Sequence, residues 1–133
     1  MNRNKILVVM PAYNEVGIIG ESIAKVLSEG YRLVVVDDGS NDDTFKKALE
    51  YPCYLLKHKV NLGQGAAIQT GITFGLKHTD CEVFFTFDAD GQHHVEDIEV
   101  VAGPILDKST EVVLGSRFAG IESENMPKSR RFF

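Results

Sequence analysis

Short, strongly apolar runs alternate with helix-like segments along this 133-residue chain, and this alternation limits its fold more than any other feature. Runs rich in β-branched residues predict strands, and the segments between them repeat apolar residues at helical spacing. Runs without polar alternation are typical of strands buried on both faces of a parallel sheet. We therefore predict an α/β fold, a three-layer α/β/α sandwich around a mostly parallel sheet. The five predicted strands cover residues 5–10, 32–38, 53–58, 82–87 and 111–118.

Helix-capping and helix-breaking residues predict where the first two helices lie. Apolar residues recur from Val16 to Leu27, and Gly30 is a plausible stop. Ser40 and Asp43 have the spacing of a capping box, which predicts a helix that begins near residue 41 and ends before residue 52, a proline.

Two further helices are predicted between the later strands. In the third helix, glycines beside the apolar face permit close packing; the face is Ile68, Ile72 and Leu76, and the glycines are Gly71 and Gly75. The fourth helix covers residues 95–105, and we expect Pro104 to kink or end it.

Composition indicates one soluble domain, residues 1–133. Apolar residues make up 44% and charged residues 25% of the chain, and the formal charge is −5, which argues against a general nucleic-acid binder. The two cysteines, Cys53 and Cys81, fit buried free thiols in a reducing cytoplasm. There is no signal peptide and no apolar run near the ~20 residues of a membrane span.

Every predicted strand is followed by a polar or glycine-rich cluster. Ligands of open parallel sheets bind at the carboxyl edge of the strands, so five such clusters together predict a binding site there. The clusters read "PAYNE", "DDGS", "NLGQGAA", "DADGQH" and "GSRF".

Asp88 and Asp90 are the strongest metal-site candidates. Residues i and i+2 of an extended segment point to the same side, ~6.6 Å apart along the chain, so both carboxylates can meet at one point. Their repulsion is relieved by a hard divalent cation, Mg²⁺ or Mn²⁺, which takes carboxylate and phosphate oxygens. Gln92 offers one more oxygen.

The other clusters offer weaker candidates, each with a structural alternative. Asp37 is placed to contact a nucleobase or ribose, and Asp38 is equally compatible with a turn and helix cap. Backbone N–H groups around Gly65 can approach an anion, although neither a Rossmann nor a Walker pattern is present. Arg117 is placed to clamp a phosphate or to form a surface salt bridge.

A zinc site is the alternative for His93 and His94. Catalytic zinc needs three protein ligands, and neither cysteine is near these histidines. We therefore expect His93 to touch bound phosphates or line the donor site and His94 to lie on the surface.

The five motifs together resemble those of family 2 glycosyltransferases with the GT-A fold, seen also among nucleotide-diphospho-sugar transferases. The similarity runs from about Lys5 to Phe118 and is greatest to the branch of dolichol-phosphate mannosyltransferases. That resemblance implies a metal-dependent, inverting transfer of a sugar from a GDP- or UDP-sugar to a polyprenyl or dolichyl phosphate.

The resemblance also implies roles for individual residues. Asp88 and Asp90 would be catalytic through the metal, which they would hold together with Gln92. The donor-binding residues would be Pro11, Tyr13, Glu15, Asp37, Asp38, Gly65, Asp88, Arg117 and Arg131, with Arg130 as the alternative to Arg131.

Family members continue beyond the last motif into an acceptor region, so we expect a donor-binding domain truncated at its C-terminus. Two alternatives stay open: a non-catalytic donor-binding fragment that needs a partner, and a sugar nucleotidyltransferase. We expect a cytoplasmic location, with the cytoplasmic face of a membrane, a sugar acceptor and a homodimer as further hypotheses.

Overall fold

The computed structural model describes residues 2–91 and 94–106. Asn2–Val95 form one compact unit, and the residues from Glu96 onward belong to a second. The first unit contains a parallel sheet in the order β3-β2-β1-β4, which confirms the predicted parallel arrangement. Its strands are β1 (Ile6–Ala12), β2 (Arg32–Asp37), β3 (Tyr54–Lys57) and β4 (Val83–Thr86). The predicted fifth strand lies outside the described residues.

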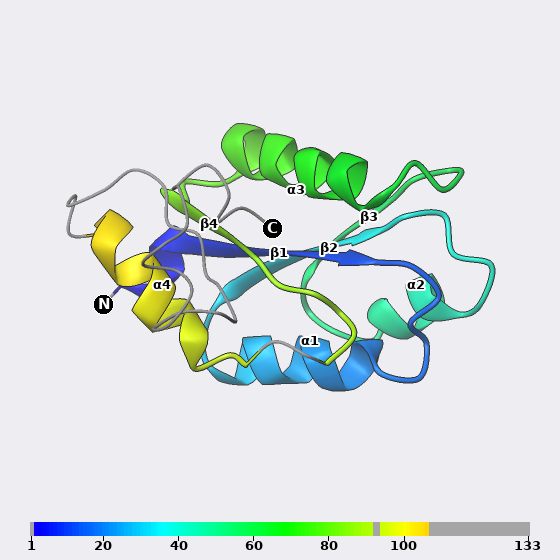
Figure 1. The fold of residues 1–133 in the computed structure, drawn as a ribbon, viewed down its shortest axis with the longest axis horizontal. Coiled ribbons are helices and arrows are strands. Elements are labelled where there is room, and N and C mark those ends of the chain that lie inside the picture. Colours follow the sequence, from blue (N-terminus) through cyan, green and yellow to red (C-terminus); the bar gives the residue numbers. More distant parts are fainter. Residues whose placement is uncertain (1, 92–93, 107–133) are drawn as a thin grey trace, which may run out of the picture. The chain divides into compact units, whose positions relative to one another are not determined.

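Helices cover both faces of this sheet, which confirms the three-layer prediction. Helix α3 lies on one face, and α1 and α2 lie on the other (Figure 1). The helices of this unit are η1 (Arg3–Lys5, a 3₁₀ turn), α1 (Ile19–Ser28), α2 (Thr44–Ala48) and α3 (Gln64–His78). In the second unit the structure describes α4 (Asp97–Leu106).

The core lies around the two central strands. Every residue of β1 is buried, as is every residue of β2 after Arg32. Burying one such Val, Leu or Ile side chain contributes about 1.5–3 kcal/mol, so these two strands fix the sheet. Strand β3 is an edge strand with exposed ends, and its run is accordingly less apolar.

Helix α3 packs on the sheet mainly through small residues; of the predicted apolar face, Ile72 packs against the core and Leu76 does not. Its buried residues are Ala67, Gly71 and Gly75, four residues apart, whereas Leu76 is 67% exposed. A Cβ atom on Gly71 would collide with Val9, and one on Gly75 would lie 2.6 Å from Leu7 Cδ2. The expectation of close packing at the glycines is confirmed, and they form the contact face themselves.

The expected capping box does not form. Helix α2 begins at Thr44, later than predicted, and its N-cap Asp43 makes no side-chain capping bond. The Ser40 hydroxyl instead donates to Asp37 Oδ1, and Asp42 Oδ1 accepts from the Thr44 N–H at 2.9 Å. Local hydrogen bonds within the loop therefore take the groups that the box would have used.

Pro104 does not end α4, which extends to Leu106. A proline lacks the N–H that an interior helical residue donates, and this is why we expected a stop there. The helix runs past the proline despite that missing donor.

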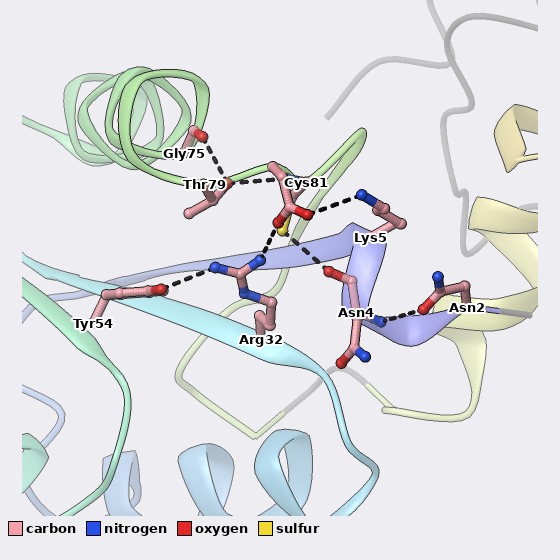
Figure 2. A network of polar contacts seen from close by, with 9 residues as sticks. Asn2, Asn4, Lys5, Arg32, Tyr54, Gly75, Thr79 and Cys81 are labelled. Atoms are coloured by element: carbon pink, nitrogen blue, oxygen red, sulfur yellow. Dashed lines mark hydrogen bonds and ion pairs between the residues drawn. The ribbon is translucent and has the colours of Figure 1, made fainter.

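A polar network joins the amino ends of all four strands (Figure 2). Asp80, just before β4, accepts from Lys5 Nζ at 2.9 Å and from Arg32 Nη1 at 2.7 Å. Arg32 Nη2 also donates to Tyr54 Oη at 2.9 Å. Because these residues precede or begin β1, β2 and β3, the network ties the edge of the sheet that lies opposite the predicted site.

Both cysteines are free thiols; Cys81 is buried and Cys53 partly buried. Burial raises the pKa of the Cys53 thiol above its ordinary value, which makes it less reactive. Within the part of the chain that the structure describes, no helix has the length and apolar character needed to cross a membrane.

Candidate functional site

A cavity of about 380 Å³ opens at the carboxyl edge of the sheet, where the sequence predicts a site. Four of the five motif clusters line it: the segment that follows β1, Asp38 directly after β2, the loop between β3 and α3, and the turn after β4. The lining residues are Pro11, Ala12, Tyr13, Glu15, Asp38, Asn61, Gly63, Gln64, Asp88, Ala89 and Asp90. All of them belong to the unit Asn2–Val95.

The turn after β4 places two carboxylates on this wall. Asp88 and Asp90 both line the cavity, whereas the side chains of Phe87 and Ala89 are buried. The Phe87 N–H donates to Val9 O at 2.9 Å and continues the β1–β4 ladder. The Ser22 hydroxyl of α1 donates a hydrogen bond to Ala89 O at 3.1 Å, which attaches the turn to helix α1.

Gly91 ends this turn with a φ of 82°, in the left-handed region that favours glycine. A Cβ atom there would also lie 2.7 Å from Ile18 Cδ1. The backbone of this turn therefore favours glycine at position 91, directly after the two carboxylates.

The segment after β1 supplies Pro11, Tyr13 and Glu15 to the cavity, as predicted. Asn14 between them has a φ of 52°, which asparagine tolerates better than most residues. Its Oδ1 accepts from the Asn41 N–H at 2.8 Å, and its own N–H donates to Ser40 Oγ at 2.9 Å. The first loop is therefore fastened to the loop after β2.

Glu15 lies in a field of negative charge. Burial raises the pKa of Glu15 above its ordinary value, and the nearby carboxylates of Asp90, Asp42 and Asp88 raise it further. Carboxylates that repel one another around a cavity favour a bound cation, because the cation lowers the energy of all of them.

The Asp38 carboxylate holds the β3–α3 loop through several hydrogen bonds. Its Oδ1 accepts from the Leu62 N–H and its Oδ2 from the Gly63 N–H, both at 2.9 Å. His58 Nδ1 lies 2.8 Å from Oδ1. Burial pushes the pKa of Asp38 upward, but the hydrogen bonds from Leu62, His58 and Gly63 outweigh it, so the pKa lies below its ordinary value. Asp38 therefore holds a loop, and it caps no helix.

Asp37 does not belong to the cavity lining and is only 1% exposed. Its Oδ1 accepts from Ser40 Oγ, whereas its Oδ2 is buried without a hydrogen-bond partner. A buried carboxylate oxygen normally has a partner, so this oxygen calls for a water molecule or a ligand group. That observation is compatible with the predicted contact to base or ribose.

The predicted metal ligands are only partly within the described residues. Among residues 2–91 and 94–106, no three His, Cys, Asp or Glu side chains gather to hold a metal ion. Asp88 and Asp90 nevertheless fit Mg²⁺ or Mn²⁺, because these ions are commonly held by one or two carboxylates plus substrate phosphates and water. Gln92, the third predicted ligand, lies outside the described residues.

Four other predicted contacts also lie outside the described residues: His93, Arg117, Arg130 and Arg131. Gly65 is described; it is exposed in the first turn of α3 and does not belong to the cavity lining, where Gly63 and Gln64 stand instead. His94 is exposed, as expected.

Two residues of the site escaped the sequence analysis. Gln64 lines the cavity, and its amide donates to Asp88 Oδ1 at 2.9 Å. His58 bridges Asp38 and Thr70, with Nε2 2.8 Å from Thr70 Oγ1. A usable signal for His58 was its place as the last residue of a predicted strand, on the same edge as the motifs.

Comparison with known proteins agrees with the motifs. The sequence profile of glycosyl transferase family 2 matches residues 7–132. The UDP-N-acetylglucosamine–dolichyl-phosphate N-acetylglucosaminyltransferase of Methanococcus voltae is 34% identical, over 95% of this chain and 57% of its own length. Dolichol-phosphate mannosyltransferase of Pyrococcus furiosus is 32% identical, over 96% of this chain and 37% of its own. The chain spans about half the length of the curated relatives it matches.

A solved structure with the same fold is glucosyl-3-phosphoglycerate synthase from Mycobacterium tuberculosis, in complex with Mn²⁺, UDP and glucosyl-3-phosphoglycerate. It matches with a TM-score of 0.62 and 26% identity, over 77% of this chain and 39% of that one. The predicted GT-A fold and the resemblance to polyprenyl-phosphate glycosyltransferases are both confirmed.

Proposed function

Because the chain belongs to glycosyl transferase family 2, we propose that it is the donor-binding part of a metal-dependent glycosyltransferase. The observation that carries the proposal is the pair Asp88 and Asp90 on the wall of one cavity at the carboxyl edge of a parallel sheet. That edge is where such sheets bind nucleotides.

The proposed donor is a sugar linked to GDP or UDP. Pro11 and Tyr13 would border the nucleoside, and Asp37 would accept from base or ribose. Asp88 and Asp90, with Gln92, would hold Mg²⁺ or Mn²⁺ against the diphosphate, and Arg117 and Arg131 would reach the phosphates. Support for a divalent cation comes from the carboxylates around Glu15 and from the Mn²⁺ and UDP in the solved relative.

The proposed reaction is a single displacement at the anomeric carbon. An acceptor oxygen forms a bond to that carbon while the bond to the diphosphate breaks, and the configuration inverts. The bound cation would neutralise the charge that develops on the departing nucleoside diphosphate. Asp88 and Asp90 would contribute by holding the cation beside the diphosphate, and the residues that line the cavity would orient the donor.

The proposed acceptor is a polyprenyl or dolichyl phosphate. A phosphate oxygen is anionic at neutral pH and attacks without a general base, whereas a sugar hydroxyl needs one. Two relatives are named for transfer to dolichyl or dolichol phosphate, which supports this choice over a sugar acceptor. Such a lipid would bring the protein to a membrane surface.

A non-catalytic donor-binding domain that needs a partner is the second candidate. The observation in its favour is that the chain spans about half the length of its curated relatives. Both candidates share the donor site and differ in whether an acceptor is used.

A thermal-shift panel tests the donor site directly. UDP, GDP and their sugars are each added to the chain with Mn²⁺ or with EDTA. A ligand at 100 times its Kd stabilises the fold by about 2.7 kcal/mol. We expect one nucleotide series to stabilise the protein in Mn²⁺ only, and Asp90→Ala to remove that shift while the unliganded Tm stays close to wild type. Equal stabilisation in EDTA, or retention of the Mn²⁺ effect by the variant, would contradict the proposal.

A further inference from the structure

Hydrogen bonds, together with the backbone of the β3–α3 loop, connect His58 to the carboxylate of Asp88 in the cavity. The first link is the pair of His58 and Asp38, whose side chains are only 11% and 4% exposed. A carboxylate only accepts, so His58 Nδ1 carries the proton toward Asp38. On the other side of the ring, Nε2 lies 2.8 Å from Thr70 Oγ1 of α3, so the imidazole is held at both nitrogens.

The second link joins Asp38 to the backbone of the β3–α3 loop. Its two oxygens accept the N–H groups of Leu62 and Gly63 separately, which fixes two consecutive peptide planes. The backbone of Val60 and Asn61 packs against Gly39 so closely that a Cβ atom there would lie 2.5 Å from Val60 C. The loop is thus held in one conformation from both sides.

The third link crosses the cavity. Gln64, directly after the loop, begins α3, and its amide nitrogen donates to Asp88 Oδ1 at 2.9 Å. Both side chains line the cavity. A hydrogen bond to one oxygen restricts rotation of the carboxylate and thereby sets the direction in which its oxygens point.

We propose that His58 is a positioning residue for the metal site: through Asp38 and the β3–α3 loop it places Gln64, which orients the Asp88 carboxylate. This inference rests on the proposed function, since it assumes that Asp88 binds a divalent cation. Partners that orient metal ligands in this way typically change metal affinity by about 10–100-fold when they are replaced.

The test measures Mn²⁺ affinity in the presence of UDP, or of GDP if the thermal-shift panel selects it, from the EPR signal of free Mn²⁺. His58→Phe keeps a ring but loses both hydrogen bonds, and Gln64→Ala removes the last link. We expect each to weaken Mn²⁺ binding by about 10–100-fold. Because the two residues act in series, the double variant should be no weaker than the weaker single variant.

Two controls separate positioning from general stability. His58→Asn retains an N–H donor near Nδ1 and should keep most of the Mn²⁺ affinity. His78→Asn changes a histidine at the exposed end of α3 and should bind as wild type does. Binding of the nucleoside monophosphate without metal should stay unchanged in every variant.

The outcomes distinguish this inference from the proposed function. If the wild type binds no nucleotide in a Mn²⁺-dependent way, the proposed function fails and this inference with it. If the wild type binds but His58→Phe lowers only the Tm and leaves Mn²⁺ affinity unchanged, His58 is a structural residue and this inference alone fails. Additive losses in the double variant would show that His58 does not act through Gln64.

Discussion

At the scale of single residues, Asp37 and Asp38 show how neighbours with the same side chain acquire different tasks. Strand geometry sends adjacent side chains to opposite sides. Asp38 reaches the loop after β3 and accepts two N–H groups, while Asp37 turns toward Ser40 and keeps one buried oxygen without a hydrogen-bond partner. The pattern "VVVDD" predicts two carboxylates at a strand end, but the N–H groups that Asp38 accepts from lie 24 and 25 residues further along the chain, and no local pattern indicates them.

Asp37→Ala tests whether the unpartnered oxygen meets the nucleoside. If base or ribose donates to this carboxylate, its loss should cost about 1.5–3 kcal/mol, which corresponds to roughly 10–150-fold weaker binding. The measurement is calorimetric titration with the free nucleoside monophosphate in EDTA, which avoids any contribution of metal. Wild-type affinity together with a lower Tm would instead assign Asp37 to the loop that Ser40 shares.

At the scale of elements, helix α3 shows a limit of periodicity. Apolar spacing predicted a helix between β3 and β4 correctly, yet it assigned the contact face to Ile68, Ile72 and Leu76. Ile72 does pack against the core, but the fully buried residues of the face are Ala67, Gly71 and Gly75, because small residues let the helix axis approach the strands. Hydrophobicity alone ranks glycine low, so such a face is visible only from the four-residue spacing of small residues.

Gly71→Ala should destabilise the protein although alanine favours helices. The added methyl group would meet Val9, and overpacking of this kind costs about 1–3 kcal/mol, more than the gain of up to about 1 kcal/mol in helix propensity. Urea unfolding measures the difference. The matched control is Gly65→Ala on the same helix, where a Cβ atom meets nothing within 4 Å and stability should stay equal or rise. A stabilised Gly71→Ala protein would show that α3 does not pack as closely as described.

The amino edge of the sheet should make stability depend on acid pH through Asp80. Hydrogen bonds from Lys5 and Arg32 lower the pKa of Asp80 to about 2, from an ordinary value of 3.8. A carboxylate whose pKa is lower in the folded state stabilises the fold above 3.8, and this contribution is lost as the pH falls toward 2. Asp80→Asn should therefore lower the Tm at pH 6, and the difference from wild type should shrink toward pH 2.

Because Asp80 is exposed, this effect should be modest and should weaken in 1 M salt. Asp43→Asn is the control, since Asp43 makes no capping bond and its replacement should leave the pH dependence unchanged. A Tm difference for Asp80→Asn that stays constant from pH 6 to pH 2 would contradict the assigned hydrogen bonds.

At the scale of the whole molecule, the sequence predicted the parts that depend on short-range pattern. The alternation of elements, the parallel sheet and the gathering of four motif clusters at its carboxyl edge all follow from local periodicity and from the topology of parallel sheets. The hydrogen bonds between distant loops could not be predicted in this way, because they depend on the tertiary fold. They link Asn41 to Asn14, Leu62 to Asp38 and Gln64 to Asp88. Sequence patterns therefore predict residues that line the cavity more readily than residues that hold those side chains in place.

Donor binding and sugar transfer should separate in this chain, because they need different parts of a glycosyltransferase. The cavity is lined entirely by residues 11–90, so the carboxylates proposed to hold the metal, Asp88 and Asp90, both lie within the unit Asn2–Val95. Transfer also requires an acceptor site, and this chain covers only 39% of the solved relative that matches its fold. We therefore expect the 133-residue chain to bind its nucleotide sugar with Mn²⁺ and to transfer the sugar to polyprenyl phosphate slowly or not at all. The measurement compares this chain with a version extended by its natural downstream sequence, where one exists, using radiolabelled donor and counting lipid-linked and free sugar. Equal turnover by the two would place the acceptor site within these residues, and the separation of the two activities would then be wrong.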